Sequence, residues 1–276
     1  MYRLMQPSDR AEILALWQRE HGEDETFLAN AIERFAGEQN VYVAEENDHI
    51  EAVAMAVPVS LQGRPGCCLY GLTGQGSLIL AGLVDHLCTQ QKQKGAGFVV
   101  VVPSGNEQAA LLQDKGFQWA FPLRCLPREV DRKLCIVAGR RDVVNRMMGN
   151  IRQNLRYSGL AYLLQAELPP EQMAVVLGDL YSRGATIVSN DNGYGIYFRK
   201  EDTLYFVEMM ATGDRAAEIL MEAAREKEVI VEKAVITVGA AQNLFLGEGT
   251  RQDYGMIRFE GEPFDVSESY MRLMLD

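Results

Sequence analysis

The chain has 276 residues, of which 47% are hydrophobic, so it is long enough for one large domain or two of ordinary size. Its 38 acidic and 27 basic residues give a formal net charge of −11. This negative charge argues against nucleic acid or an anionic membrane as the primary ligand, and it is compatible with a cationic ligand such as an amine. Acidity is also a common means of keeping a protein soluble.

The five cysteines and three histidines are scattered, apart from the adjacent pair Cys67-Cys68. Neighbouring residues on a strand point to opposite faces, so this pair does not predict a disulfide. No C-x-x-C motif occurs and the histidines lie far apart in sequence, so we expect no metal site. The N-terminal residues lack an apolar leader and no run of 18 apolar residues occurs, so we expect a cytoplasmic protein.

The first part of the chain predicts a short strand, two helices and two longer strands. Ser8 is the expected N-cap of the first helix, and His21-Gly22 is its expected end. Apolar residues at helical spacing predict the second helix. We expect strands at 2–5, 41–45 and 50–60, and helices at 8–21 and 24–35.

The stretch 67–121 predicts alternating strands and helices. We expect strands at 67–72, 98–102 and 117–121, and helices at 78–94 and 106–115. A glycine turn, Thr73-Gly74-Gln75-Gly76-Ser77, joins the first of these strands to the first helix.

The glycine turn is a candidate phosphate site. Backbone N–H groups at a helix N-terminus are unpaired and carry partial positive charge, and glycine lets an anion approach them closely. The candidate binding residues are Leu72, Thr73, Gly74, Gln75, Gly76 and Ser77. The alternative is a tight strand-to-helix turn with a serine cap.

The order of elements in residues 1–125 resembles the GCN5-related N-acetyltransferase (GNAT) superfamily. The segment Asn106-Glu107-x-Ala109-x-x-Leu112, followed by Lys115-Gly116-Phe117, is similar to a family motif. The resemblance implies a strand that splays from its neighbour into a pyrophosphate loop, with acetyl-CoA as cosubstrate. It places Asn106 near the pantetheine or the acyl carbonyl, although Asn106 could equally cap its own helix.

Two departures from the family pattern bear on catalysis. The strand enters the glycine turn almost directly, where the family has a longer loop with an arginine. The family also has a tyrosine that protonates the leaving thiolate, and Leu112 or Gln113 stands at that position here. Neither can donate a proton as a phenol does.

In many GNAT proteins the first two helices flank the acceptor cleft. The resemblance therefore makes His21 and the acidic run 23–25 candidates to line that cleft. The alternative is a solvated junction between two helices.

The second half of the chain repeats the pattern of the first. Residues 122–132, with two prolines and several charges, are interpreted as the crossing between halves. We expect strands at 134–138, 162–166, 185–189, 195–199, 203–211 and 233–238, and helices at 140–157, 171–183 and 215–227. Asp214 would repel a phosphate and is expected to cap the last helix, so this half should not bind acyl-CoA.

We therefore predict an α/β fold with two GNAT-like modules of mixed sheet flanked by helices, at 1–126 and 127–276. Tandem proteins of this kind include the enhanced-intracellular-survival acetyltransferases. The chain is similar to a short bacterial branch of these at Val207-Glu208-Met209-Met210-Ala211 and at the C-terminal segment from Tyr254 to Asp276.

The tandem resemblance implies two catalytic candidates. In the larger relatives the C-terminal carboxylate reaches the first module's active site and can act as a base, which makes Asp276 a candidate. The alternative is a tail that only docks, through apolar residues such as Met271 and Leu275. Glu208, an acid inside a strand, could serve as a base or bind a cationic amine, or it could lie exposed on the open face of the sheet.

We predict an N-acetyltransferase that moves an acetyl group from acetyl-CoA to a primary amine on a small molecule, a peptide N-terminus or a lysine. One alternative is a GNAT-derived protein that binds acyl-CoA or regulates a partner without turnover. Another is an assembly module that binds a peptide in the sheet cleft. We expect no nucleic-acid or membrane partner, and self-association stays open.

Overall fold

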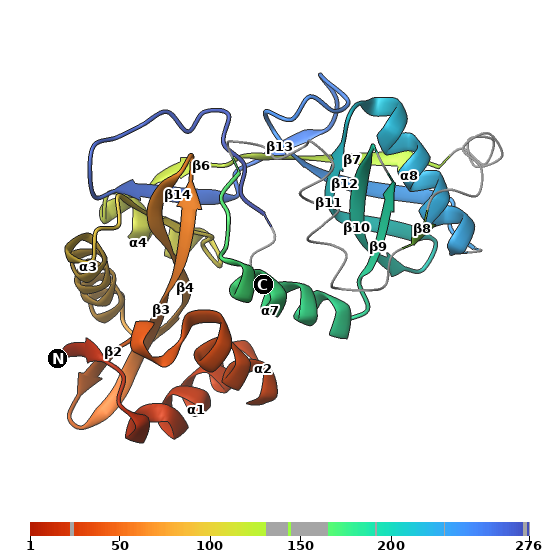
Figure 1. The fold of residues 1–276 in the computed structure, drawn as a ribbon. Coiled ribbons are helices and arrows are strands. Elements are labelled where there is room, and N and C mark those ends of the chain that lie inside the picture. Colours follow the sequence, from red (N-terminus) through yellow and green to blue (C-terminus); the bar gives the residue numbers. More distant parts are fainter. Residues whose placement is uncertain are drawn as a thin grey trace. The chain divides into compact units, whose positions relative to one another are not determined.

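The computed structural model describes residues 1–22, 25–130, 143–144, 165–190, 192–228, 230–272 and 275. The chain forms two compact units (Figure 1). Unit 1 comprises Met1–Ala120, Ala166–Val175 and Tyr254–Val266, and unit 2 comprises Phe121–Gln165, Val176–Asp253 and Ser267–Asp276. A single cut after residue 126 therefore does not separate the units, because each takes in segments from both halves of the sequence.

Unit 1 is built on a seven-stranded mixed sheet in the order β1-β2-β3-β4-β5-β14-β6. The strands are β1 (Tyr2–Leu4), β2 (Val41–Glu46), β3 (His49–Leu61), β4 (Arg64–Gly74), β5 (Phe98–Val101), β6 (Gln118–Ala120) and β14 (Gly255–Phe259). The helices are α1 (Arg10–His21), α2 (Glu25–Asn30), α3 (Ser77–Gln93) and α4 (Asn106–Asp114), with 3₁₀ turns at Pro7–Asp9 and Glu38–Asn40 and a π-helix at Ala31–Ala36. The order of elements predicted for residues 2–121 is confirmed.

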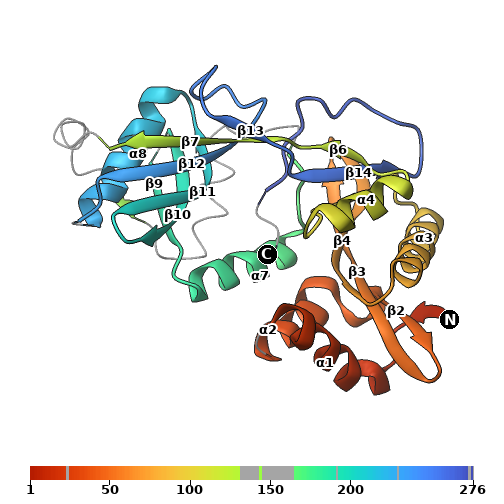
Figure 2. The ribbon, with the colours of Figure 1, turned by 180° about the vertical axis from the view of Figure 1, so that it is seen from behind.

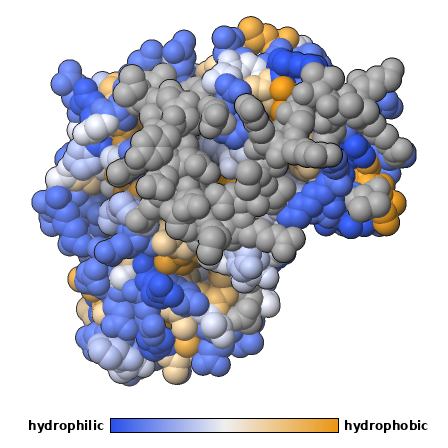
Figure 3. All heavy atoms as spheres, turned by 45° about the vertical axis from the view of Figure 1, so that its right-hand side comes forward, coloured by the Kyte–Doolittle hydropathy of each residue, from blue (hydrophilic) through white to orange (hydrophobic). Residues whose placement is uncertain are grey.

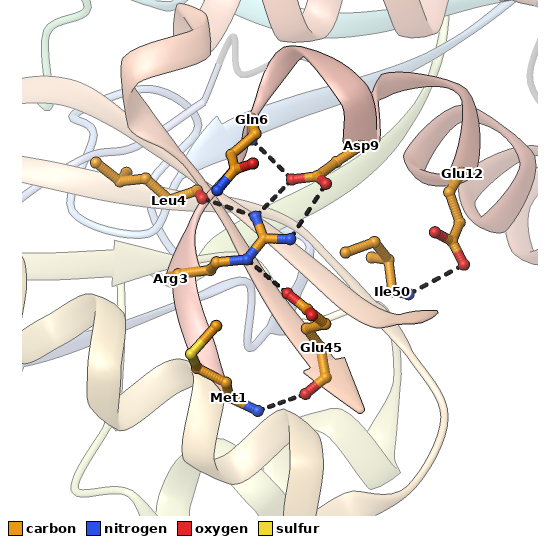
Figure 4. A network of polar contacts seen from close by, with 8 residues as sticks. All are labelled: Met1, Arg3, Leu4, Gln6, Asp9, Glu12, Glu45 and Ile50. Atoms are coloured by element: carbon orange, nitrogen blue, oxygen red, sulfur yellow. Dashed lines mark hydrogen bonds and ion pairs between the residues drawn. The ribbon is translucent and has the colours of Figure 1, made fainter. Parts of the chain in front are cut away.

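The start of α1 differs from the prediction, because Ser8 does not cap it. Residues Pro7–Asp9 form a 3₁₀ turn in which the Asp9 carboxylate accepts the Gln6 N–H at 2.7 Å. Arg3 on β1 forms ion pairs at 2.6 Å with both Asp9 and Glu45 (Figure 4). The hydrogen bond from Arg3 holds the pKa of the Asp9 carboxyl below its ordinary value.

Different helices cover the two faces of the unit 1 sheet. Alternate residues of β3, such as Ala54, pack with Leu87 and its neighbours on α3. On the other face, the ring of Tyr70 on β4 lies 5.8 Å from the ring of Trp17 on α1 and 5.1 Å from that of Phe35 in the π-helix. The sheet is therefore buried on both sides around β3 and β4.

A β-bulge interrupts β4 at Gly71. Along β3 the pairing steps from Met55 opposite Tyr70 to Val53 opposite Thr73, so β4 has one extra residue. Gly71 has φ +62°, and a Cβ atom there would lie 2.3 Å from the Trp17 ring. Because the period of a strand is two, the bulge reverses which face each later residue points to.

Beyond the bulge, β4 leaves its other neighbour. The parallel pairing with β5 ends where Leu69 lies opposite Val101. Leu72 then faces the same core as Leu69, as the bulge requires. Among the described strands, β5 therefore pairs with β4 only as far as Leu69.

Unit 2 is built on a second seven-stranded sheet, in the order β13-β7-β12-β11-β10-β9-β8 (Figure 2 shows its reverse side). The strands are β7 (Leu123–Glu129), β8 (Val143–Val144), β9 (Thr186–Asn190), β10 (Gly193–Lys200), β11 (Thr203–Ala211), β12 (Lys233–Gly239) and β13 (Thr250–Gln252). The helices are α7 (Pro170–Ser182), which supplies residues to both units, and α8 (Asp214–Lys227). The predicted strand and helix order of residues 185–238 is confirmed.

Three predictions for this half are wrong. Residues 123–129 form the strand β7 rather than a crossing, and Val143–Val144 form a strand inside the segment predicted as a helix. Asp214 does not cap α8, which begins after Gly213, and its carboxylate accepts the Phe245 N–H at 2.6 Å. The predicted strand at 134–138 lies outside the described residues.

The two sheets share one design and exchange one strand each. In unit 1 the parallel pair β4–β5 is followed by β14, which pairs antiparallel with β5 and β6. In unit 2 the parallel pair β11–β12 is followed by β7, which pairs antiparallel with β12 and β13. Each sheet is therefore completed by a strand from the other half of the sequence.

No described helix combines the length and apolar character that a membrane crossing needs. Among the described residues visible in Figure 3, hydrophilic side chains predominate. The large exposed hydrophobic side chains come from separate segments: Met1, Tyr2, Leu4, Leu78, Trp119, Tyr181, Tyr205, Ile230 and Leu246.

Candidate functional site

A cavity of about 690 Å³ lies in unit 1, beside the carboxyl end of β4. Residues of β4, the glycine turn, α3, α4 and the end of α1 form its wall. The lining residues are Glu20, His21, Leu72, Thr73, Gly74, Gly76, Ser77, Leu80, Ser104, Gly105, Asn106, Glu107, Gln108 and Leu111. The structure thus brings together every cofactor-binding residue predicted from the sequence except Gln75.

Part of the glycine turn belongs to the sheet. Gly74 pairs with Ala52 on β3, and the Gln75 N–H donates to the Glu51 carbonyl at 3.2 Å. A Cβ atom at Gly74 would lie 2.4 Å from the Glu51 oxygen, so the close approach of the two strands requires glycine there. The backbone of Gly74 and Gln75 is therefore occupied by the sheet, which narrows the predicted phosphate site.

The first turn of α3 is the part of the turn that is open to an anion. Gly76 is the N-cap with φ +83° and Ser77 is the first helical residue, so the serine cap of the alternative interpretation is not formed. A Cβ atom at Gly76 would meet only Ile79, at 3.7 Å, so the positive φ and not crowding requires glycine. The first amides of a helix lack intrahelical acceptors, and here they lie at the cavity wall.

Gln108 on α4 bridges the gap where β4 and β5 separate. Its side-chain amide donates to the Leu72 carbonyl at 3.0 Å, and its amide oxygen accepts the Ser104 N–H at 2.9 Å. Asn106 begins α4 after the N-cap Gly105 and does not cap the helix itself. The α4 wall of the cavity is thus tied directly to the edge of β4.

His21 also lines the cavity. It is the last residue of α1, which ends at Gly22 with φ +70° and a Gly22 N–H bond to the Gln18 carbonyl at 2.9 Å. His21 Nε2 lies 2.6 Å from Thr73 Oγ1 on β4, and the imidazole contacts the Trp17 ring edge-on at 5.9 Å. The expectation that His21 lines a cleft is met, whereas residues 23–24 of the acidic run lie outside the described residues.

The described lining contains two carboxylates and no lysine or arginine. Glu20 is exposed and pairs with Arg19 at 3.1 Å, and Glu107 lies in the first turn of α4. An anion in the cavity would therefore be held by backbone amides and not by a basic side chain. A cationic group would be attracted to the carboxylates.

The residues at the position of the family tyrosine, Leu112 or Gln113, place no proton donor in the described part of the cavity. Leu112 is fully buried in the core that packs under α3. Gln113 is exposed, and neither residue is among those that line the cavity.

In unit 2, side chains of the protein fill the region beyond the parallel strand pair β11–β12, which corresponds to the pair β4–β5 of unit 1. Gln242 is 2% exposed and donates to the Met209 carbonyl at 3.0 Å, while its amide oxygen accepts the Gly239 N–H. The Tyr270 ring packs against Gly239, where a Cβ atom would approach it to 2.6 Å. Gln242 thus repeats the bridge that Gln108 makes in unit 1, in a closed setting.

Glu208 lies on β11 of unit 2 and is fully buried, not exposed on an open face. Burial raises the pKa of its carboxyl to about 8, opposed by the nearby Tyr270 hydroxyl, the Arg272 charge and the Tyr194 hydroxyl. Its catalytic role stays a prediction, and the unit 1 cavity does not include it.

The C-terminal segment is docked. Tyr270, Met271 and Leu275 are each at most 3% exposed, and Arg272 Nε donates to the Val207 carbonyl at 3.1 Å. Asp276, the other predicted catalytic residue, lies outside the described residues. In the described part of the chain, no group of three or more His, Cys, Asp or Glu residues is placed to hold a metal ion.

Sequence reasoning missed Gln108 and the contact between His21 and Thr73. Gln108 stands in the matched motif as an unspecified position, so nothing in the motif singled it out. His21 and Thr73 are 52 residues apart, and only the packing of α1 on β4 brings them together. A histidine immediately before a helix-ending glycine, at the predicted cleft, was the available signal.

No protein-family model matches the chain, and no curated protein matches it in sequence. Solved structures share its fold. A GCN5-related N-acetyltransferase from Kribbella flavida superposes with a TM-score of 0.73 at 15% identity, over 94% of this chain and 70% of the other. Eis1 from Mycobacterium abscessus gives 0.64 at 12% identity, over 94% and 74%.

A tandem GNAT protein from the clavulanic acid biosynthesis pathway gives a TM-score of 0.50 at 12% identity, over 96% of this chain and 99% of its own. Identities this low establish the fold and nothing finer. The predicted resemblance and the predicted α/β fold of two GNAT-like modules are confirmed.

Proposed function

We propose that this protein, which has the fold of the GCN5-related N-acetyltransferases, transfers an acetyl group from acetyl-CoA to a primary amine. The observation that supports the proposal is the unit 1 cavity, whose lining includes the first turn of α3, the carboxyl end of β4 and His21. These supply an anion site, backbone groups for an amide-bearing chain, and a group able to exchange protons.

The residues around the cavity fit an acyl-CoA thioester in two respects. The amides at Gly76 and Ser77 would hold a phosphate by helix-terminus geometry, and backbone groups at the carboxyl end of β4 would bond to the amides of an extended chain. Asn106 and Gln108 also line the cavity. When bound, acetyl-CoA supplies an activated acyl group, and the protein has to orient it toward the amine.

Catalysis of this kind asks little of side chains. A backbone N–H of β4 can polarise the thioester carbonyl, and the cavity can hold the amine in line with it. Glu20 and Glu107 favour a cationic acceptor, with which the acidic composition of the chain is compatible. The acceptor would be a small molecule, a peptide N-terminus or a lysine side chain.

The second candidate function is acyl-CoA binding or regulation without turnover. The observation in its favour is that Leu112 and Gln113 take no part in the described cavity wall, so neither supplies the proton that the family tyrosine would give. Coenzyme A thiolate is a fair leaving group, so loss of that tyrosine does not by itself abolish transfer. Turnover decides between the two functions.

Calorimetric titration of acetyl-CoA into the wild-type protein and Gly76→Val tests binding. We expect the variant to lower the affinity about tenfold or more, because a branched side chain blocks the anion's approach and opposes φ +83°. Gly63→Val is the matched control, since Gly63 has φ +72°, open space around it and a place in the turn between β3 and β4. The acetyl-CoA affinity of Gly63→Val should equal that of the wild type.

Turnover is then measured by coenzyme A release with 1,4-diaminobutane, glucosamine and Nα-acetyl-lysine as acceptors. Wild-type protein that gives no heat with millimolar acetyl-CoA contradicts both functions. Binding without release for any acceptor leaves the non-catalytic function. The catalytic roles of Glu208 and Asp276 stay predictions.

A further inference from the structure

We propose that His21 is the catalytic residue that takes the proton from the acceptor amine. The proposal rests on the acetyltransferase function above and assigns a specific group to one of its steps. It starts from three facts: His21 lines the cavity, its imidazole is fixed by Thr73 and Trp17, and it stands at the end of a capped helix.

The step needs a base. A primary amine is mostly protonated at neutral pH, and only the neutral amine can attack a thioester carbon. Histidine is the side chain that ordinarily changes charge between pH 5 and 8, whereas a carboxylate of ordinary acidity is a much weaker base. Among the described lining residues, the other ionisable side chains are the carboxylates of Glu20 and Glu107.

Thr73 engages one of the two imidazole nitrogens. Thr73 is 4% exposed, and its hydroxyl oxygen lies 2.6 Å from His21 Nε2. With Nε2–H donating to Thr73 Oγ1, the lone pair of Nδ1 is left to accept a proton. The edge-on contact with Trp17 restricts the ring, so the imidazole is oriented before substrate arrives.

The protons and electrons balance without any further reactant. The ammonium group gives one proton to Nδ1, and the neutral nitrogen forms a C–N bond with the acyl carbon. The C–S bond breaks with its electron pair on sulfur, and the second proton of the nitrogen neutralises the thiolate. The imidazolium returns its proton to water, which its exposed position allows.

The position of Thr73 ties the base to the acyl site. Thr73 is on β4, two residues beyond the bulge at Gly71, in the part of the strand that lines the cavity. The contact between Thr73 and His21 therefore links the imidazole directly to the strand that would hold the thioester.

The test compares His21→Gln with the wild type, using whichever of the three acceptors turns over fastest. Glutamine can still bond to Thr73 but cannot take the proton, so we expect kcat to fall about 100-fold, the lower range for a general base. The acetyl-CoA dissociation constant and both KM values should stay within twofold. His49→Gln is the matched control, an exposed histidine on β3 that pairs with Glu12.

Three further variants separate chemistry from structure. Free imidazole should restore part of the kcat of His21→Ala, which a merely structural role would not allow. Thr73→Val should lower kcat by losing the orienting hydroxyl, and Thr73→Ser should retain most of it. A kcat of His21→Gln within twofold of the wild type overturns the proposal, as does a loss confined to the amine KM.

The outcomes also separate this proposal from the function on which it rests. Wild-type protein that binds acetyl-CoA but acetylates none of the three amines overturns the acetyltransferase function, and the role of His21 with it. A wild type that turns over while His21→Gln keeps its kcat overturns the role of His21 alone.

Discussion

At the scale of single residues, the most unusual group is the carboxyl of Glu208. It is fully buried in unit 2, and its pKa is raised to about 8 because burial disfavours the charged form. The folded protein thus holds the proton more tightly than the unfolded chain, whose ordinary value is 4.5. Stability from this group is fully present below pH 4.5 and is lost as the pH rises through 8.

We expect Glu208→Gln to remove this pH dependence. The neutral amide resembles the protonated acid, so the variant should match the wild type near pH 5 and exceed it at pH 9. The difference in the free energy of unfolding should be on the order of 4 kcal/mol, from about 1.4 kcal/mol per pKa unit. Denaturant unfolding between pH 5 and 9 measures it.

Glu222→Gln is the control for Glu208→Gln. Glu222 is equally buried but is paired with Arg225, whose Nε donates to its carboxylate at 2.6 Å. Its replacement should destabilise the protein at every pH in that range, because Arg225 loses its partner. A wild type whose stability is flat from pH 5 to 9 would contradict the assigned protonation of Glu208.

At the scale of elements, both sheets close the gap beyond their parallel strand pair with a glutamine. Gln108 binds the Leu72 carbonyl and Gln242 binds the Met209 carbonyl, each at 3.0 Å. The two strand residues are equivalent, because each follows a bulge and faces the core again. The two glutamines differ in their access to solvent, because Gln242 is buried and Gln108 is half-buried at a cavity.

The pair makes a matched prediction. Gln242→Ala removes the side chain that bonds the buried Met209 carbonyl and the Gly239 N–H, and should lower the free energy of unfolding by about 2 kcal/mol or more. Gln108→Ala should cost less than about 1 kcal/mol, because water can replace the amide in the cavity. Chemical denaturation of the two variants checks this, and equal losses would mean that the cavity wall is as dry as the unit 2 core.

At the scale of the whole molecule, the tail and the cavity belong to different units. The lining residues span 20–111 in unit 1, while residues 267–276 belong to unit 2. We therefore expect removal of Leu275 and Asp276 to leave the acetyl-CoA affinity within a few fold, measured by calorimetry. A loss of affinity would contradict the assignment of acetyl-CoA to this cavity.

Turnover of the same truncated protein separates two proton acceptors. Abolished turnover supports the predicted role of the terminal carboxylates, and retained turnover supports His21. Asp276→Asn, which keeps the α-carboxyl, is the control for the side chain. The thermal stability of the truncated protein and of Asp276→Asn should be measured alongside their turnover. Leu275 is 3% exposed, so its removal costs packing and can lower the stability of the truncated protein.

Local elements of this protein could be predicted because their signals are local. Helical spacing of apolar residues, β-branched runs and turn glycines act over a few residues, and they placed most strands and helices of residues 2–121 and 185–238. The glycine turn and the start of α4 were located the same way, and both line the cavity. Atom-level details of the turn, such as the Gln75 bond to Glu51, needed the register of β3 against β4.

The tertiary structure alone decided which segments complete each sheet and each contact of the site. β7 was missed because its prolines and charges look like a linker, yet Pro127 lies beyond the reach of β13, where a missing N–H costs little. β14 pairs with β5 across more than 150 residues, and His21 meets Thr73 across 52. Sequence periodicity determines what a segment becomes, whereas pairing between distant segments depends on how whole sheets and helices pack, which no local pattern encodes.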